Sequence, residues 1–195
     1  MSLRTRAKSL TVVTILAAGA VALIGSTQTW AVARLADAEL AVSGATAVPV
    51  LQPLTLTVLA LGLVLTLVGR ALRYVLGALA VVVAAGLVVL SAPMLGAPPL
   101  SAVAPVVTEH TGLAGAEAIA GVVQDVTATA WPLVTLIAAI LIGLAGLAAL
   151  TTGHLWVRGG RRYDAAADGT ARDDAAPLDA IDSWDELSRG DDPTR

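Results

Sequence analysis

The chain has 195 residues, of which 56% are hydrophobic and only 14% are charged, and its mean hydropathy is +0.80. Soluble domains are typically about 45–50% apolar and about 25% charged, so this composition is that of a membrane protein. There is no cysteine, which excludes disulfide bonds, thiolate metal sites and cysteine nucleophiles.

Four uncharged apolar runs are long enough to cross a bilayer as helices. A hydrocarbon core of ~30 Å requires about 20 helical residues. We therefore predict an all-α membrane protein whose domain of residues 1–153 has four transmembrane helices. The expected spans are residues 10–26, 54–69, 74–90 and 131–152, and the loops 27–53 and 91–130 lie on one side. Only RALR (residues 70–73) separates the second span from the third, so these two spans form a tight antiparallel hairpin.

The basic residues indicate the orientation of the spans. Regions that flank spans on the cytoplasmic side are enriched in Lys and Arg. Here the two long loops contain a single arginine, Arg34, so they are expected outside, with Trp30 and Trp131 at the outer membrane interface. The N- and C-termini are then cytoplasmic, in a multi-pass protein of the cell membrane. The basic residues of the cytoplasmic side are Arg4, Arg6, Lys8, Arg70, Arg73, Arg158, Arg161 and Arg162.

The first span has an alternative interpretation as a cleaved signal peptide. It has a basic start, an apolar run, and an A-x-A-like sequence at residues 31–33. Cleavage there would leave three spans with the same orientation. Because residue 33 lies nine positions beyond the apolar run, we favour a retained helix.

The spans themselves contain no Asp, Glu, Lys, Arg or His. Ionisable groups inside a membrane usually mark ion pathways, so their absence disfavours an ion-coupled pump. The hydroxyls of Thr55, Thr57, Thr66 and Thr135 are expected to bond to their own helices. Small residues at spacings of four indicate close packing within the bundle, with a homo-oligomer as the second interpretation.

The outer loops contain two local patterns. Residues 27–53 alternate in short pieces that favour a strand or a hairpin. In residues 91–130 we expect an outer amphipathic helix, because apolar residues recur at i, i+3, i+4 and i+7. Its apolar positions are Ile119, Val122, Val123 and Val126, opposite Glu117, Gln124 and Asp125, and the prolines that preclude one continuous helix through the loop are Pro93, Pro98, Pro99 and Pro105.

No residue pattern supports catalysis or cofactor binding. Glu109 and His110 are adjacent, with Glu117 and Asp125 further along, but one histidine without a helical partner is a poor zinc site. We interpret these four residues as solvated loop. No nucleophile, phosphate-binding or dinucleotide-binding motif occurs. We therefore predict no enzymatic activity, no metal or cofactor, and no nucleic acid partner.

Residues 154–195 form a polar, acidic tail that is expected to be cytoplasmic and largely disordered. Within it, residues 178–194 contain a short recognition-like segment, because Leu178, Ile181, Trp184 and Leu187 are spaced by three. A helix this short is marginal alone and would fold on a partner. The alternative is that Trp184 rests on the membrane surface. The residues predicted to bind a soluble partner are Ile181, Trp184, Asp185, Leu187 and Arg189.

Three stretches carry a specific resemblance: GSTQTW at the end of the first span, VSGATAVP in the first outer loop, and WDELSRGDDPT near the C-terminus. With four spans, this chain resembles the tryptophan-biosynthesis-associated membrane protein family of high-G+C bacteria. The family pattern Trp-Asp-x-Leu-Ser-Arg-Gly-x-Asp-Pro-Thr matches residues 184–194, whereas Gln28 stands near the place of a family arginine. The resemblance implies an association with a pathway and no particular mechanism.

Two functions are consistent with these features. The first is a non-enzymatic membrane protein whose cytoplasmic tail recruits a soluble partner and so connects tryptophan metabolism to the lipid bilayer. The second is a small transporter or exporter subunit for tryptophan or an indole-like intermediate. Four short spans without an internal repeat or a discontinuous helix disfavour the transporter.

Overall fold

The computed structural model describes residues 3–153, and four long helices dominate this part of the chain. They are α1 (Leu3–Thr27), α3 (Leu51–Leu67), α4 (Arg70–Ser91) and α7 (Trp131–Thr152). The predicted, mostly helical architecture is confirmed. Three of the helices, α1, α4 and α7, are long and apolar enough to cross a membrane, whereas α3 is apolar but has 17 residues.

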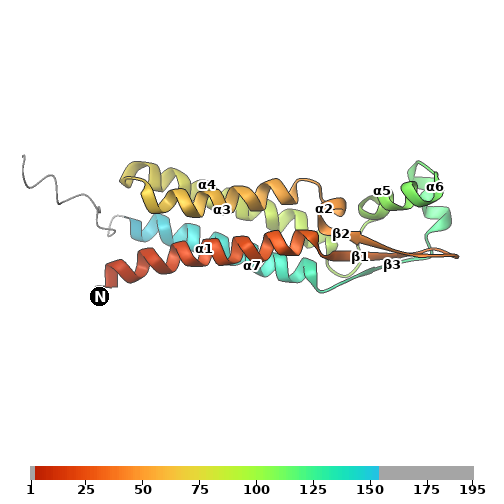
Figure 1. Ribbon diagram of the computed structural model, residues 1–195, viewed down its shortest axis with the longest axis horizontal. Helices are drawn as coiled ribbons and strands as arrows, with labels where there is room; N and C mark the ends of the chain where they lie inside the picture. The colour runs from red at the N-terminus through yellow and green to blue at the C-terminus, as the bar shows by residue number, and fades with distance from the viewer. Residues whose placement is uncertain (1–2, 154–195) are drawn as a thin grey trace, which may run out of the picture. The chain divides into compact units, whose positions relative to one another are not determined.

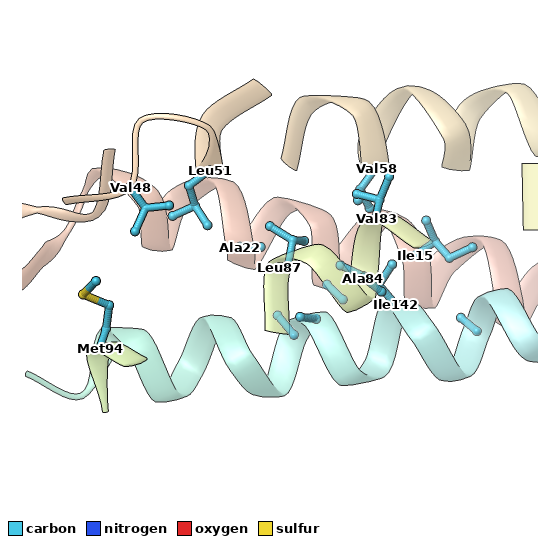
Figure 2. Close-up of a cluster of buried hydrophobic side chains, with 14 of the residues drawn as sticks. Ile15, Ala22, Val48, Leu51, Val58, Val83, Ala84, Leu87, Met94 and Ile142 are labelled. Carbon is cyan, nitrogen blue, oxygen red and sulfur yellow. The ribbon is translucent and has the colours of Figure 1, made fainter. Parts of the chain in front are cut away.

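The four helices pack side by side into a bundle (Figure 1). Helix α1 packs between α3 and α7, and α7 also packs along α4. Small residues allow this close approach: a Cβ atom at Gly146 of α7 would lie 3.1 Å from the carbonyl oxygen of Gly77 in α4. Figure 2 shows the core, in which Ile15, Val58 and Ile142 come together from three helices. The interior of the bundle is therefore filled by aliphatic side chains.

A three-stranded antiparallel sheet lies beyond one end of the bundle (Figure 1). Its strands are β1 (Thr29–Arg34), β2 (Glu39–Ser43) and β3 (Asp125–Ala128), in the order β2-β1-β3. Val32 in the central strand pairs with Ala41 on one side and with Thr127 on the other. The hairpin expected in residues 27–53 is confirmed. The predicted all-α fold class is wrong in one respect, because it did not include this sheet.

Residues 91–130 differ in two ways from their sequence-based description. The predicted amphipathic helix ends early, because α6 covers only Ala116–Val122 and Val126 belongs to β3. The backbone of this segment pairs with β1 instead of continuing its helix. Pro105 lies inside helix α5 (Leu100–Thr111). A proline in this position removes one helical hydrogen bond without ending the helix.

Helices α5 and α6 cover one face of the sheet and form a second, smaller core. Ala31 and Val42 of the sheet pack against Val103 and Val107 of α5 and against Ile119 of α6. Two short elements connect this region to the bundle, namely α2 (Gly44–Ala47) and the 3₁₀ turn η1 (Ala92–Met94). We call the sheet together with α5 and α6 the cap, and the adjoining end of the bundle the cap end.

Candidate functional sites at the two ends of the bundle

Trp30 lies at the junction between the bundle and the cap. It was expected at the membrane interface, but its side chain is fully buried. The indole N–H donates a hydrogen bond of 2.8 Å to the carbonyl oxygen of Gly25 near the end of α1. The ring lies against Gly44, where an added Cβ would be 2.6 Å from Nε1. A local glycine provides space for the ring inside the protein, so the indole packs against protein rather than facing the membrane surface.

The stretches GSTQTW and VSGATAVP, which carry the family resemblance, meet at this junction. Besides the contact between Trp30 and Gly44, the Gly44 N–H donates to the carbonyl oxygen of Gln28 at 3.0 Å. Ser43 caps helix α2, since its Oγ accepts from the Thr46 N–H at 3.2 Å. Both stretches therefore shape the joint at which the chain leaves α1 and enters the sheet.

The same joint connects the first and last helices of the bundle. Strand β1 follows α1 after one residue, and β3 ends three residues before α7. The Thr129 hydroxyl donates to the carbonyl oxygen of Thr29 at 2.6 Å, and the Thr129 N–H donates to that of Trp30 at 2.9 Å. The paired strands thus fix the cap ends of α1 and α7 relative to each other.

Each of the four long helices also has one fully buried hydroxyl near its cap end. Ser26 and Thr55 donate to their own helices, to the carbonyl oxygens of Leu23 at 2.7 Å and Gln52 at 2.8 Å. Thr57 and Thr66 do the same, so the expectation is confirmed for these three threonines. Thr135 differs, because its hydroxyl does not bond to its own helix. The four buried hydroxyls belong to Ser26, Thr55, Ser91 and Thr135.

The hydroxyls of Ser91 and Thr135 have no hydrogen-bond partner among residues 3–153. Thr135 faces Gly25, where an added Cβ would lie 2.6 Å from the Thr135 Oγ1. Glycine at position 25 therefore allows α1 and α7 to approach each other at this level.

Two cations bind helix ends at the opposite end of the bundle, which we call the basic end. The Lys8 ammonium donates to the carbonyl oxygen of Thr66 at 3.1 Å. The Arg73 side chain, which is only 3% exposed, donates to the carbonyl oxygens of Gly153 at 2.9 Å and Val68 at 3.3 Å. Cations near helix C-termini are favourable because the last carbonyls are unpaired and carry partial negative charge. Arg73 thus joins the ends of α3 and α7.

The ionisable residues of the cap are exposed and scattered over separate elements. Glu109 and His110 lie in the last turn of α5, rather than in a loop, whereas Glu117 lies in α6 and Asp125 begins β3. His110 Nε2 is 4.0 Å from Asp37 Oδ2. Across residues 3–153, no three histidines or acids come close enough together to hold a metal ion.

Apolar hollows mark the described surface at two places. The first lies between α5 and α6 in the cap and has a volume of about 460 Å³. The second runs along the seam between α1 and α7, where two adjoining hollows share Thr14 and Leu141. The cap pocket is lined by Leu100, Ser101, Ala104, Pro105, Thr108, Gly115, Ala116 and Ile119. Sequence patterns missed this pocket, because it forms where two helices separated by a glycine turn face each other.

The predicted partner-binding residues of the tail lie outside the described residues. These are Ile181, Trp184, Asp185, Leu187 and Arg189. The short recognition-like segment therefore stays a prediction from the sequence.

Long apolar helices that pack into a bundle, with a small cap at one end, define a multi-pass membrane protein. The family model described as tryptophan-associated transmembrane protein matches residues 12–194. The chain therefore belongs to this family, as the resemblance of its motifs indicated. No curated protein matches the chain. No solved structure matches it either. The family is described by its membrane location and its association with tryptophan, not by an enzymatic activity.

Proposed function

We propose that this protein is a four-span protein of the cell membrane that recruits a soluble partner of tryptophan biosynthesis through its cytoplasmic tail. In this proposal residues 1–153 form the membrane domain, and residues 154–195 form the tail. Both chain termini are cytoplasmic, and the cap faces the outside. The protein has no catalytic role of its own.

The observation that carries this proposal is the arrangement of the basic end. Lys8 near the start of α1 and Arg73 beside the end of α7 both bind the C-terminal carbonyls of α3. The start of the bundle and the exit point of the tail therefore lie at the same end. Lys and Arg concentrate at the cytoplasmic ends of spans, so the tail would enter the cytoplasm.

Helix α3 is the shortest of the four proposed spans. Its 17 residues rise roughly 25 Å at 1.5 Å per residue. This length is a few ångströms less than the bilayer core of about 30 Å. A short span is accommodated by local thinning of the bilayer and by flanking cations that reach the interface. At the basic end, Lys8 and the buried Arg73 bind the carbonyl oxygens of Thr66 and Val68 at the end of this short helix.

Retention of the first helix is part of the proposal. Cleavage after residue 33 would remove α1 from between α3 and α7. It would also cut the central strand β1, in which Ala31 and Ala33 are fully buried. Such a cut would leave β2 and β3 without their common neighbour.

The tail supplies the recognition element in this proposal. Trp184 is its proposed anchor, because tryptophan is enriched at the energetic centres of protein interfaces. The acidic residues around it favour a partner with a basic groove, and they keep the segment away from the anionic inner leaflet.

The test is photo-crosslinking in cells that express the full-length protein. A photoreactive amino acid at Ser188 would report on partners of the tail, with Trp184→Ala as the variant and Asp168→Ala as the matched control. We expect a crosslinked soluble protein that is lost in Trp184→Ala and retained in Asp168→Ala. Crosslinks to lipid alone, or equal protein crosslinks in both variants, would contradict the proposal.

Export of tryptophan or of an indole-like intermediate by a single bundle has less support. Aliphatic side chains such as Val58, Leu87 and Ile142 fill the bundle interior, and they provide no polar path through it. Unchanged efflux of labelled tryptophan from cells without the protein would agree with this assessment.

A further inference from the structure

We infer that the pocket between α5 and α6 binds a small, uncharged, flat aromatic molecule with one N–H donor, of which indole is the simplest example. This inference concerns the cap alone and does not depend on the tail or on its partner. Three features of the pocket support it: its size, its lack of charge, and one hydrogen-bond acceptor created by Pro105.

The size and lining of the pocket suit a small apolar ligand. Its volume of about 460 Å³ falls within the range of roughly 300–1,000 Å³ for small-molecule sites. Ile119, only 4% exposed, also belongs to the core of the cap. The wall formed by α5 consists of Ser101, Ala104, Pro105 and Thr108, which share one helical face. Small side chains on this wall leave room for a flat ring.

The lack of charge in the pocket favours an uncharged ligand over an amino acid or another carboxylate. Not one of its eight lining residues is charged. Transfer of an ionised carboxylate or ammonium group into an apolar site is strongly unfavourable without a partner. Glu109 and Glu117 are exposed residues of the two helices that form the pocket, and their negative charge disfavours a carboxylate ligand. Tryptophan itself is therefore disfavoured, and a neutral indole ring is favoured.

Pro105 leaves a hydrogen-bond acceptor on the wall of the pocket. In a regular α-helix the carbonyl oxygen of Ser101 would accept from the N–H of residue 105. Proline has no N–H, so this bond cannot form. Ser101, Ala104 and Pro105 all line the pocket on one face of α5, so we infer that the freed Ser101 carbonyl is accessible from it. The hydroxyls of Ser101 and Thr108 provide further acceptors. A ligand with one N–H group on an apolar ring could donate a hydrogen bond to one of these acceptors.

Equilibrium binding of labelled indole to the full-length protein in nanodiscs tests the inference. Indole also partitions into lipid, so the specific signal is the saturable part. The variant Ala116→Leu fills the pocket from α6, and Ala120→Leu adds the same group at an exposed position of α6 outside the pocket. We expect Ala116→Leu to weaken indole binding by about tenfold or more and Ala120→Leu to change it by less than about twofold.

Two further comparisons test the chemistry of the ligand. Indene replaces the indole N–H by CH₂, and we expect it to bind about fivefold more weakly than indole. In Pro105→Ala the new N–H occupies the Ser101 carbonyl, so the ratio between indole and indene should fall towards one. Free tryptophan should bind at least about tenfold more weakly than indole.

Several outcomes would overturn the inference. They are equal indole binding by Ala116→Leu and the unaltered protein, tryptophan binding as tight as that of indole, and a ratio between indole and indene that Pro105→Ala leaves unchanged. If Ala116→Leu does not fold, Ser101→Leu fills the pocket from the exposed side of α5 and replaces it in the comparison.

Discussion

Gly44 shows how a single missing side chain positions a large one. Its backbone angles lie outside the left-handed region that favours glycine, so the reason for glycine here is space. The Trp30 ring occupies the volume that a Cβ atom would take, and it bonds to the Gly25 carbonyl from there. The ring is fully buried in the core of the bundle, and this limits its ability to move aside.

We expect Gly44→Ala to destabilise the protein by about 1–3 kcal/mol, because the added methyl group overpacks the site. The matched control is Gly86→Ala in α4, where nothing lies within 4 Å of the new Cβ. There alanine should stabilise the helix by about 0.5–1 kcal/mol. Thermal unfolding in detergent, followed by tryptophan fluorescence, measures both. Equal midpoints for the two variants would mean that Trp30 can move aside freely.

Thr135 permits a second test at the scale of single residues. Its buried hydroxyl has no partner among the described residues, and such a group costs about 1–3 kcal/mol. We expect Thr135→Val, which keeps the shape of the side chain, to leave stability unchanged or to raise it. Thr57→Val, at an exposed hydroxyl that bonds to Pro53, is the comparison. A clear loss of stability in Thr135→Val would reveal a bound water molecule or ligand on that hydroxyl.

At the scale of elements, Arg73 determines how two helix ends are held. Its guanidinium donates to carbonyls beyond the last turns of both α3 and α7. Hydrogen bonds from charged groups are worth about 1.5–3 kcal/mol each when partly buried. The planar fork of arginine reaches two acceptors at once, whereas an ammonium group is a compact point charge.

We therefore expect Arg73→Ala to lower the free energy of unfolding by about 2–4 kcal/mol, with Arg73→Lys intermediate. The control is Arg34→Ala, which removes an exposed ion pair of 2.9 Å with Glu39 and should cost less than about 1 kcal/mol. Denaturant titration in mixed micelles compares the three variants. A loss in Arg34→Ala as large as that in Arg73→Ala would contradict this assignment.

The sequence indicates the long helices well, because a run of apolar residues that crosses a bilayer leaves few alternatives to a helix. Their boundaries are less certain, since α1 extends back to Leu3 through a basic segment. The sheet could be predicted only in part. The β1–β2 hairpin is local in sequence, whereas β3 pairs with a strand about 90 residues earlier. From Ile119 to Val126 the apolar spacing fits a helix. Residues 125–128 form a strand instead because they pair with the distant strand β1.

In the functional sites, too, local features could be predicted from the sequence, whereas contacts between distant residues could not. The basic residues at the ends of spans were visible in the sequence, but the bonds from Lys8 and Arg73 to α3 depend on how the helices pack. The cap pocket depends on two helices meeting across a turn with positive φ at Gly112 and Gly115. Trp30 was assigned to the interface because burial by Gly44 is not a local property of the chain.

At the scale of the whole molecule, the absence of cysteine makes the proposed orientation simple to measure. A single cysteine at Ala36, in the exposed turn of the hairpin, should react with a membrane-impermeant maleimide in intact cells. A single cysteine at Ser188 should react only after the membrane is permeabilised. The reverse pattern would contradict the cytoplasmic tail, and with it the proposed function.

The pairing of β1 with β3 has a consequence for biosynthesis. The ribosome delivers β1 early, but its second neighbour emerges only after α3 and α4 have been made. Until then the central strand β1 has one unpaired edge. The strand pairing that fixes α1 relative to α7 is also missing. The alignment of α1 with α7 therefore depends on the last part of this region to be made, and a nascent chain that stalls before Asp125 would contain α1, α3 and α4 without the β1–β3 pairing.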